Sequence, residues 1–130
     1  MAPTFYAIGL AVADMSTALA FYRRLGLDIP PEADKEPHVN YELPGGHVLM
    51  WDTVETIQSI DPSWTPPAGG HRVGLAFLCA DAAEVDRTYA DMVAAGYTGH
   101  KEPWDAFWGQ RYAMLRDPDG NTVELCTPFS

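Results

Sequence analysis

The chain has 130 residues, a length that suits one domain, and its 47% hydrophobic content is enough for a buried core. Its 18 acidic residues outnumber 8 Lys and Arg residues, which gives a formal net charge of −10. That charge repels nucleic acid phosphates and anionic membranes, so a neutral or cationic small molecule is the better partner.

The sequence shows no pattern typical of a membrane span, a signal peptide or a cysteine-based metal or disulfide motif. No apolar run approaches the roughly 20 residues of a membrane span, and no signal-peptide core follows Met1. We therefore expect a cytoplasmic protein. Cys79 and Cys126 have no CxxC spacing, so buried reduced thiols are expected in place of a disulfide framework or a zinc knuckle.

The chain contains an imperfect internal repeat. IGLAV at 8–12 and VGLAF at 73–77 each precede an Asp-led helical pattern that contains a Tyr and ends on a Gly. LPGGHVLMW and DPDGNTVEL close the two copies. The repetition indicates one small module written twice. We expect modules at about 1–60 and 70–130 within a single domain, 1–130.

The first copy opens with a predicted strand over 5–12, after which Asp14 or Ser16 can cap a helix. Gly26 supplies the left-handed stop of that helix. Residues 39–43 and 48–52 flank PGG as a hairpin, and the proline-rich segment 53–70 is expected to be a connector. The inward stripe of the helix consists of Met15, Ala18, Leu19, Tyr22 and Leu25.

The second copy follows the same plan. A strand over 72–79 leads to Asp81, with Glu84 as its capping-box partner, and the helix ends at Gly96. Strands over 111–116 and 122–126 flank the DPDG turn. The inward stripe of this helix consists of Val85, Tyr89, Met92 and Val93.

Each module therefore reads as βαβββ, which predicts an α+β fold. Two such modules can form a curved mixed sheet around a shared cavity, with the helices on the outer faces.

The paired modules, the run DAFWGQRYAMLRDPDGN and the phrases GGHVLMWDTVE and GGHR resemble the vicinal oxygen chelate superfamily. That superfamily contains glyoxalase I, extradiol dioxygenases, fosfomycin-resistance enzymes and bleomycin-binding proteins. Within it the chain looks most like mitomycin-resistance-type drug-binding proteins. This resemblance implies the glyoxalase/bleomycin resistance fold and a homodimer whose sites are formed partly by both subunits.

The resemblance also supplies a register for metal ligands. In metal-using relatives a His precedes the apolar pair that opens each module, and a carboxylate or amide stands on each last strand. The corresponding residues here are Ala7, Met50, Arg72 and Glu124. Only Glu124 suits a divalent ion, because Ala7 has no donor atom and a thioether is a poor ligand for hard ions. We expect no metal and no cofactor.

Two readings compete at these positions. A one-residue slip of register could bring His71, His47 and Glu124 together as a facial triad, although the repeat alignment opposes it. Alternatively Arg72 and Glu124 pair across the cavity floor, where the two charges neutralise each other.

Aromatic residues suggest what fills the cavity. The cluster WDAFWGQRY places Trp104, Phe107 and Trp108 in a loop before a strand, where the fold does not demand them and stacking is their natural use. Strand alternation turns Tyr112 and Met114 inward with Glu124, and His38 and Asn40 are their first-module counterparts. Trp108 with His38 is the expected clamp on a planar ligand. The remaining candidate binding residues are Met50, Trp51 and Arg72.

Asn40 and Tyr112, with Gln110 or Arg111, offer hydrogen-bond donors to carbonyl or carbamate groups. These features predict metal-free sequestration of a planar aromatic or quinone-type antibiotic, without catalysis. The alternative is an enzyme of the same fold, either metal-dependent or using Glu124, His38 or Tyr112 as acid or base. A third reading is an interaction module whose exposed tryptophans meet a protein.

Overall fold

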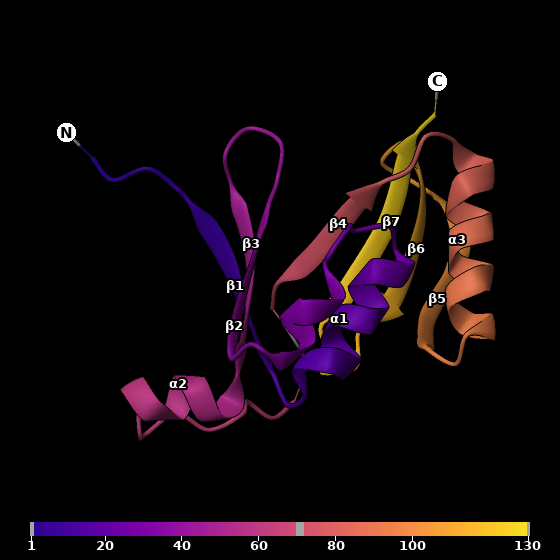
Figure 1. Ribbon diagram of the computed structural model, residues 1–130. Coiled ribbons are helices and arrows are strands. Elements are labelled where there is room, and N and C mark those ends of the chain that lie inside the picture. Colours follow the sequence, from indigo (N-terminus) through magenta and orange to yellow (C-terminus); the bar gives the residue numbers. More distant parts are fainter. Residues whose placement is uncertain (1, 70–71, 130) are drawn as a thin grey trace. The chain divides into compact units, whose positions relative to one another are not determined.

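A computed structural model describes residues 2–69 and 72–129. The chain divides into two compact units, Met1–Ala68 and Gly69–Ser130. Each unit combines a mixed sheet with at least one helix (Figure 1), which confirms the predicted α+β class. That the two units act as one domain stays a prediction.

The first unit begins with strand β1 (Ala7–Val12) and helix α1 (Met15–Arg24). Asp14 caps α1 as expected, because its carboxylate accepts the Thr17 backbone N–H, and Gly26 follows the helix with φ 115°. A short 3-10 helix, η1 (Pro31–Lys35), comes next. Arg23 ties η1 to α1 through an ion pair of 2.8 Å with Asp34.

Strands β2 (His38–Glu42) and β3 (Val48–Thr53) form the expected hairpin around the PGG turn. The first sheet has the order β1-β3-β2, with β1 parallel and β2 antiparallel to β3. It contains three strands among the described residues, so the prediction of βαβββ for this module is wrong by one strand. The chain from α1 to β2 is occupied by η1 and its flanking loops.

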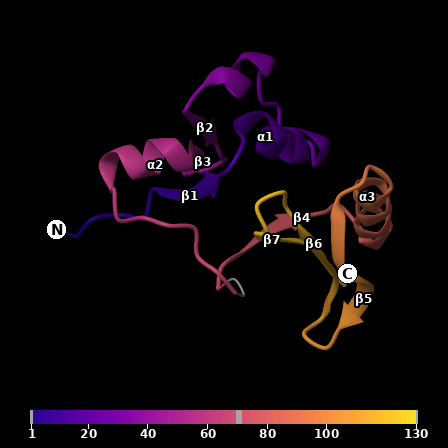
Figure 2. The ribbon, with the colours of Figure 1, turned by 90° about the horizontal axis from the view of Figure 1, so that it is seen from below.

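The expected connector 53–70 contains a helix that the sequence reading missed. Helix α2 (Val54–Ile60) begins at Thr53, whose hydroxyl accepts the Thr56 backbone N–H at 3.2 Å. It contacts β3 and β1 (Figure 2). The cap and the polar first turn were readable, but the prolines that follow obscured a helix of only 7 residues.

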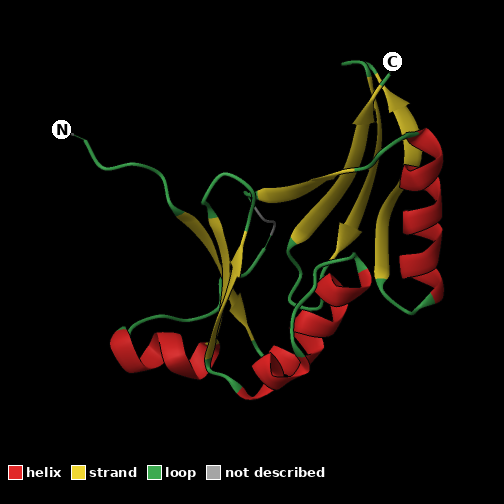
Figure 3. Ribbon diagram, turned by 45° about the horizontal axis from the view of Figure 1, so that its top comes forward, coloured by secondary structure: helices red, strands yellow, loops and turns green. Residues whose placement is uncertain are grey.

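The second unit has the predicted βαβββ plan, including one strand, β5 (Thr98–Ala106), for which the sequence reading gave no bounds. It contains β4 (Gly74–Leu78), α3 (Ala82–Ala94), β5, β6 (Gln110–Arg116) and β7 (Thr122–Pro128). The sheet order is β4-β7-β6-β5, and α3 lies along one face (Figure 3). The Asp81 carboxylate caps α3 by accepting the Glu84 N–H at 2.8 Å.

Alternation along the strands of the second sheet decides which side chains form the core. Val85 and Met92 of α3 are fully buried, together with Ala113, Leu115 and Leu125 of the sheet. Val93, predicted to point inward, is instead 42% exposed, and Tyr89 is only partly buried. No helix within residues 2–69 and 72–129 is long and apolar enough to span a membrane.

Candidate functional site

The second sheet has a far face, meaning the face opposite α3, that carries several of the predicted site residues. Directly paired residues of neighbouring antiparallel strands share a face. Trp104 pairs with Tyr112, and Met114 pairs with Glu124. Because Ala113 and Leu115 point toward α3, their neighbours on β6 point away from it. The far face therefore brings together four residues that the sequence reading assigned to one site.

Three aromatic rings cluster at the β5–β6 end of the far face. The ring centroids of Trp108 and Tyr112 are 5.2 Å apart, those of Trp104 and Tyr112 are 5.6 Å apart, and those of the two tryptophans are 6.1 Å apart. All three contacts are edge-on, a geometry that contributes about 1 kcal/mol per pair beyond area burial. The rings therefore hold one another in place.

Trp108 lies in the turn between β5 and β6 and keeps 47% of its surface exposed. Its indole Nε1–H donates to Gln110 Oε1 at 2.8 Å, which fixes the ring and occupies that amide oxygen. Phe107, beside it in the turn, is 97% exposed, with its ring 5.0 Å from that of Trp108. Trp108 thus offers a held, half-exposed flat surface.

Trp104 lies on β5, so its predicted position in a loop is wrong. The strand runs as far as Ala106, and its register with β6 shifts between Gly99 and Trp104. Lys101 places its ammonium 4.6 Å from the centre of the Trp104 ring. The available sequence signals for a hairpin here were the β-propensity of the aromatic residues and the glycine at position 109, which adopts φ 92° in the turn.

Tyr112 and Glu124 form a polar pair on the far face, with the Tyr112 hydroxyl donating to Glu124 Oε1. Burial, the bond to Glu124 and the charge of Glu124 raise the pKa of Tyr112 well above its ordinary value of 10.0. The hydroxyl proton is therefore committed to Glu124. Tyr112 is consequently unsuited to act as an acid near neutral pH, and as a ligand contact it offers oxygen lone pairs and its ring in place of the expected O–H donor.

The expected pair of Arg72 with Glu124 is not formed. Arg72 precedes β4 and is exposed, and no ion pair joins it to Glu124 in the part of the chain that the structure describes. The Tyr112 hydroxyl provides the partner of the carboxylate instead.

Arg111 also departs from its expected role. It points to the α3 side of the sheet, where its guanidinium bonds to Asp86 at 3.0 Å and to Asp105 at 3.1 Å. These two carboxylates raise its pKa. With Tyr89 and Glu102 it lines an open groove between α3 and β5, on the face opposite the aromatic cluster. Arg111 therefore does not belong to the far face.

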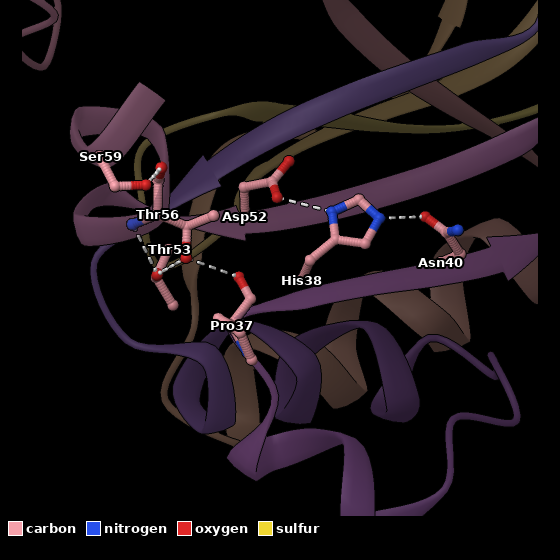
Figure 4. A network of polar contacts seen from close by, with 7 residues as sticks. All are labelled: Pro37, His38, Asn40, Asp52, Thr53, Thr56 and Ser59. Carbon is pink, nitrogen blue, oxygen red and sulfur yellow. Dashed lines mark hydrogen bonds and ion pairs between the residues drawn. The ribbon is translucent and has the colours of Figure 1, made fainter. Parts of the chain in front are cut away.

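The first sheet also has a face that carries predicted site residues. His38 pairs with Asp52 across the β2–β3 ladder, and Asn40 pairs with Met50, so all four share what we call the His38 face. His38 Nδ1 lies 2.6 Å from Asp52 Oδ1, and Nε2 lies 2.7 Å from Asn40 Oδ1 (Figure 4). The bond to Asp52 is the largest cause of the raised pKa of His38. Asp52 was missed from sequence, although its i+2 spacing from Met50 places it on this face.

Helix α2 fixes the backbone next to His38. The carbonyl of Pro37 accepts the Thr53 backbone N–H at 3.1 Å and the Thr56 hydroxyl at 3.2 Å (Figure 4). The helix that the sequence reading missed therefore anchors the residue that precedes the imidazole.

The prediction that Trp51 binds the ligand is wrong. It follows Met50 on β3 and so points to the opposite face, where it is fully buried with its ring 5.4 Å from that of Tyr22. Its role is to fill the core of the first unit. The proposed clamp of Trp108 with His38 stays a prediction, because the two residues belong to different units.

The residues considered as metal ligands lie on separate strands and loops. Ala7 lies on β1 and Met50 on β3, with Met50 on the His38 face and beside Gly9. Within residues 2–69 and 72–129, no three His, Cys, Asp or Glu side chains lie together as metal ligands do. His47 of the alternative triad lies beside the ring of Phe5, 5.6 Å away, and His71 lies outside the described residues.

These features define an α+β protein of two related units, each with a mixed sheet that has polar and aromatic side chains on one face. A model of the Glyoxalase/Bleomycin resistance protein/Dioxygenase superfamily matches residues 4–125. The chain belongs to this superfamily, also called the vicinal oxygen chelate superfamily. No curated protein matches it.

Solved structures show the same fold. A glyoxalase/bleomycin resistance protein/dioxygenase family enzyme from Burkholderia phytofirmans PsJN is 19% identical, with TM-score 0.80, and the match covers 95% of this chain and 97% of that one. A glyoxalase-related enzyme from Fulvimarina pelagi is 22% identical, with TM-score 0.78 and coverage of 95% and 87%. A protein of unknown function from Agrobacterium tumefaciens is 27% identical, with TM-score 0.73 and coverage of 99% and 97%.

Proposed function

We propose that this protein binds and sequesters a planar aromatic or quinone-type antibiotic, as mitomycin-resistance-type proteins do, without chemical change to the drug. The observation that carries the proposal is the cluster of Trp104, Trp108 and Tyr112 on the far face. Their edge-on contacts hold the half-exposed ring of Trp108 in a fixed orientation. A fixed aromatic surface favours a flat ligand, because little side-chain freedom is lost on binding.

The polar groups beside the cluster support a ligand with hydrogen-bond donors. Glu124 receives one bond from Tyr112 through Oε1, and its second oxygen lies over Gly74. An amine or carbamate N–H of the drug could donate to the second oxygen. Mostly apolar walls with a few polar groups of this kind are typical of small-molecule sites.

His38 is the second proposed stacking residue, on its own unit. Its side chain is 41% exposed, and Asp52 and Asn40 hold the ring. Both ring nitrogens are engaged, so neither is free to act as a general base or a metal ligand in this arrangement. This argues for a binding surface over acid–base chemistry at His38.

The test is a calorimetric titration of chelator-treated protein with mitomycin C and other planar antibiotics, followed by mass spectrometry of the recovered ligand. Saturable binding with unchanged ligand is expected, and Trp108→Ala should weaken it by about fivefold, on the order of 1 kcal/mol for a lost stacking contact. Trp64→Ala is the matched control, because Trp64 follows α2 in the first unit and takes no part in the three ring contacts of the cluster.

A chemically altered ligand would establish an enzyme of this superfamily in place of a sequestering protein. Binding that returns only after a divalent ion is restored would contradict metal-free sequestration. The homodimer and cytoplasmic location that the sequence suggests belong to the same proposal, and sedimentation of the purified protein measures the former.

A further inference from the structure

His38 sits between two oxygen atoms that both require a hydrogen from its ring. Asp52 Oδ1 is a carboxylate oxygen that only accepts, at 2.6 Å from Nδ1. Asn40 Oδ1 is an amide oxygen that only accepts, at 2.7 Å from Nε2. Figure 4 shows the ring between these two oxygens. A ring that donates through both nitrogens is an imidazolium. The two partners also fix the plane of the ring.

From this geometry we propose that Asp52 and Asn40 are positioning residues that hold His38 as a charged, oriented imidazolium. The ring then presents a cationic flat surface that favours a neutral, carbonyl-rich chromophore over a planar cation. This inference rests on the proposed function and names its ligand class. Quinone carbonyl oxygens carry partial negative charge, which the imidazolium attracts, whereas a cationic dye is repelled.

Within the first unit, few other charged groups face His38. Strand β3 contributes Asp52 as its one ionisable side chain between Val48 and Thr53. On β2 itself, Glu42 lies four residues away, and the first turn of α2 contains Glu55. The strand β1 contains no ionisable side chain. Asp52 is therefore the group on which the protonation of His38 depends most.

The direction of the pH dependence follows from the raised pKa of His38. The ring is charged below that pKa and neutral above it, so affinity for a neutral quinone should fall as pH rises through it. Affinity for a permanently cationic planar dye should rise over the same range. Because the ring is partly exposed, we expect each change to be about threefold.

The experiment combines an NMR titration of the imidazole with ligand titrations at several pH values. The His38 signal is assigned by its loss in His38→Gln, and its pKa is measured in the wild type, Asp52→Asn, Asn40→Asp and Glu42→Gln. The first variant should lower the pKa and the second should raise it. Glu42→Gln removes a charge from the same strand without touching His38, so it should change the pKa least.

Mitomycin C and the cationic dye ethidium are then titrated into the wild type and Asp52→Asn. Opposite pH slopes for the two ligands, both displaced to lower pH in Asp52→Asn, would support the proposal. An unchanged His38 pKa in Asp52→Asn, or slopes of the same sign for both ligands, would overturn it. If mitomycin C and ethidium both fail to bind the wild type, the proposed function and the ligand preference fall together. The NMR series still decides whether Asp52 and Asn40 hold the ring charged.

Discussion

Because Gly74 has no side chain, the Glu124 carboxylate can occupy the space beside it. A side chain at position 74 should therefore displace that carboxylate. A Cβ atom at Gly74 would lie 2.1 Å from Glu124 Oε2 and 3.2 Å from Cδ. Gly74 is not among the glycines with positive φ, so its backbone accepts alanine. Since the obstructing atoms end a flexible side chain, Gly74→Ala should displace the carboxylate and break its bond from Tyr112.

Two opposing contributions set the size of the effect. Alanine reduces the freedom of the unfolded chain, which stabilises the protein by about 0.4–1 kcal/mol. Loss of a hydrogen bond to a charged acceptor costs about 1.5–3 kcal/mol, and partial exposure reduces that figure. We expect a net loss of about 1 kcal/mol in the free energy of unfolding, measured by urea denaturation.

The repeat provides a matched control. Gly9 occupies the equivalent place in IGLAV, and a Cβ there would lie an ordinary 3.6 Å from Met50 Cε. Gly9→Ala should therefore be neutral or slightly stabilising. NMR titration of Tyr112 gives a second readout, because loss of the Glu124 bond should lower its raised pKa. Equal stability of the two variants, with an unchanged Tyr112 titration, would refute the reasoning.

Three further changes test the fold. Asp117→Ala removes a buried carboxylate that accepts the backbone N–H groups of Asp119, in the DPDG turn, and of Asn121, which follows it. Urea denaturation should show a loss of about 2–3 kcal/mol. Bonds from Thr17 lower the pKa of Asp14 below 3.8, so its contribution to stability is present above 3.8 and lost as pH falls through the lowered value. Asp14→Asn should flatten this acid-side dependence in thermal melts. Trp51→Ala should cost about 3–5 kcal/mol by leaving a core cavity, whereas a small loss would contradict its placement.

The parts of the fold that were predicted correctly depend on local chemistry. Asp14 and Asp81 cap helices because a carboxylate can reach the free N–H groups of the next turn, and this needs no tertiary information. The repeat then placed three strands of the second unit, β4, β6 and β7, but not β5. Period-2 alternation likewise put Tyr112, Met114 and Glu124 on one face.

The parts that could not be predicted depend on partners distant in sequence. Alternation along β3 places Met50 and Trp51 on opposite faces of the sheet. The contact of Trp51 with Tyr22 of α1 is what shows that the Trp51 face is the one covered by a helix. Arg111 is drawn to Asp86, 25 residues away, which the strand pattern does not reveal. The first unit has one strand fewer than predicted among the described residues, because the prediction assumed that the repeat was complete.

The four tryptophans of the chain differ in surroundings, and the fluorescence of two of them, Trp51 and Trp108, reports on different events. Trp51 is fully buried, and its Nε1 has no hydrogen-bond partner among the described residues. An indole in such a dry setting emits at short wavelength and reports when the first unit unfolds. Trp108 is half-exposed and bonded to Gln110, so its emission is red-shifted and responds to whatever covers its ring. Unfolding and ligand contact can therefore be followed at separate wavelengths in one unlabelled sample.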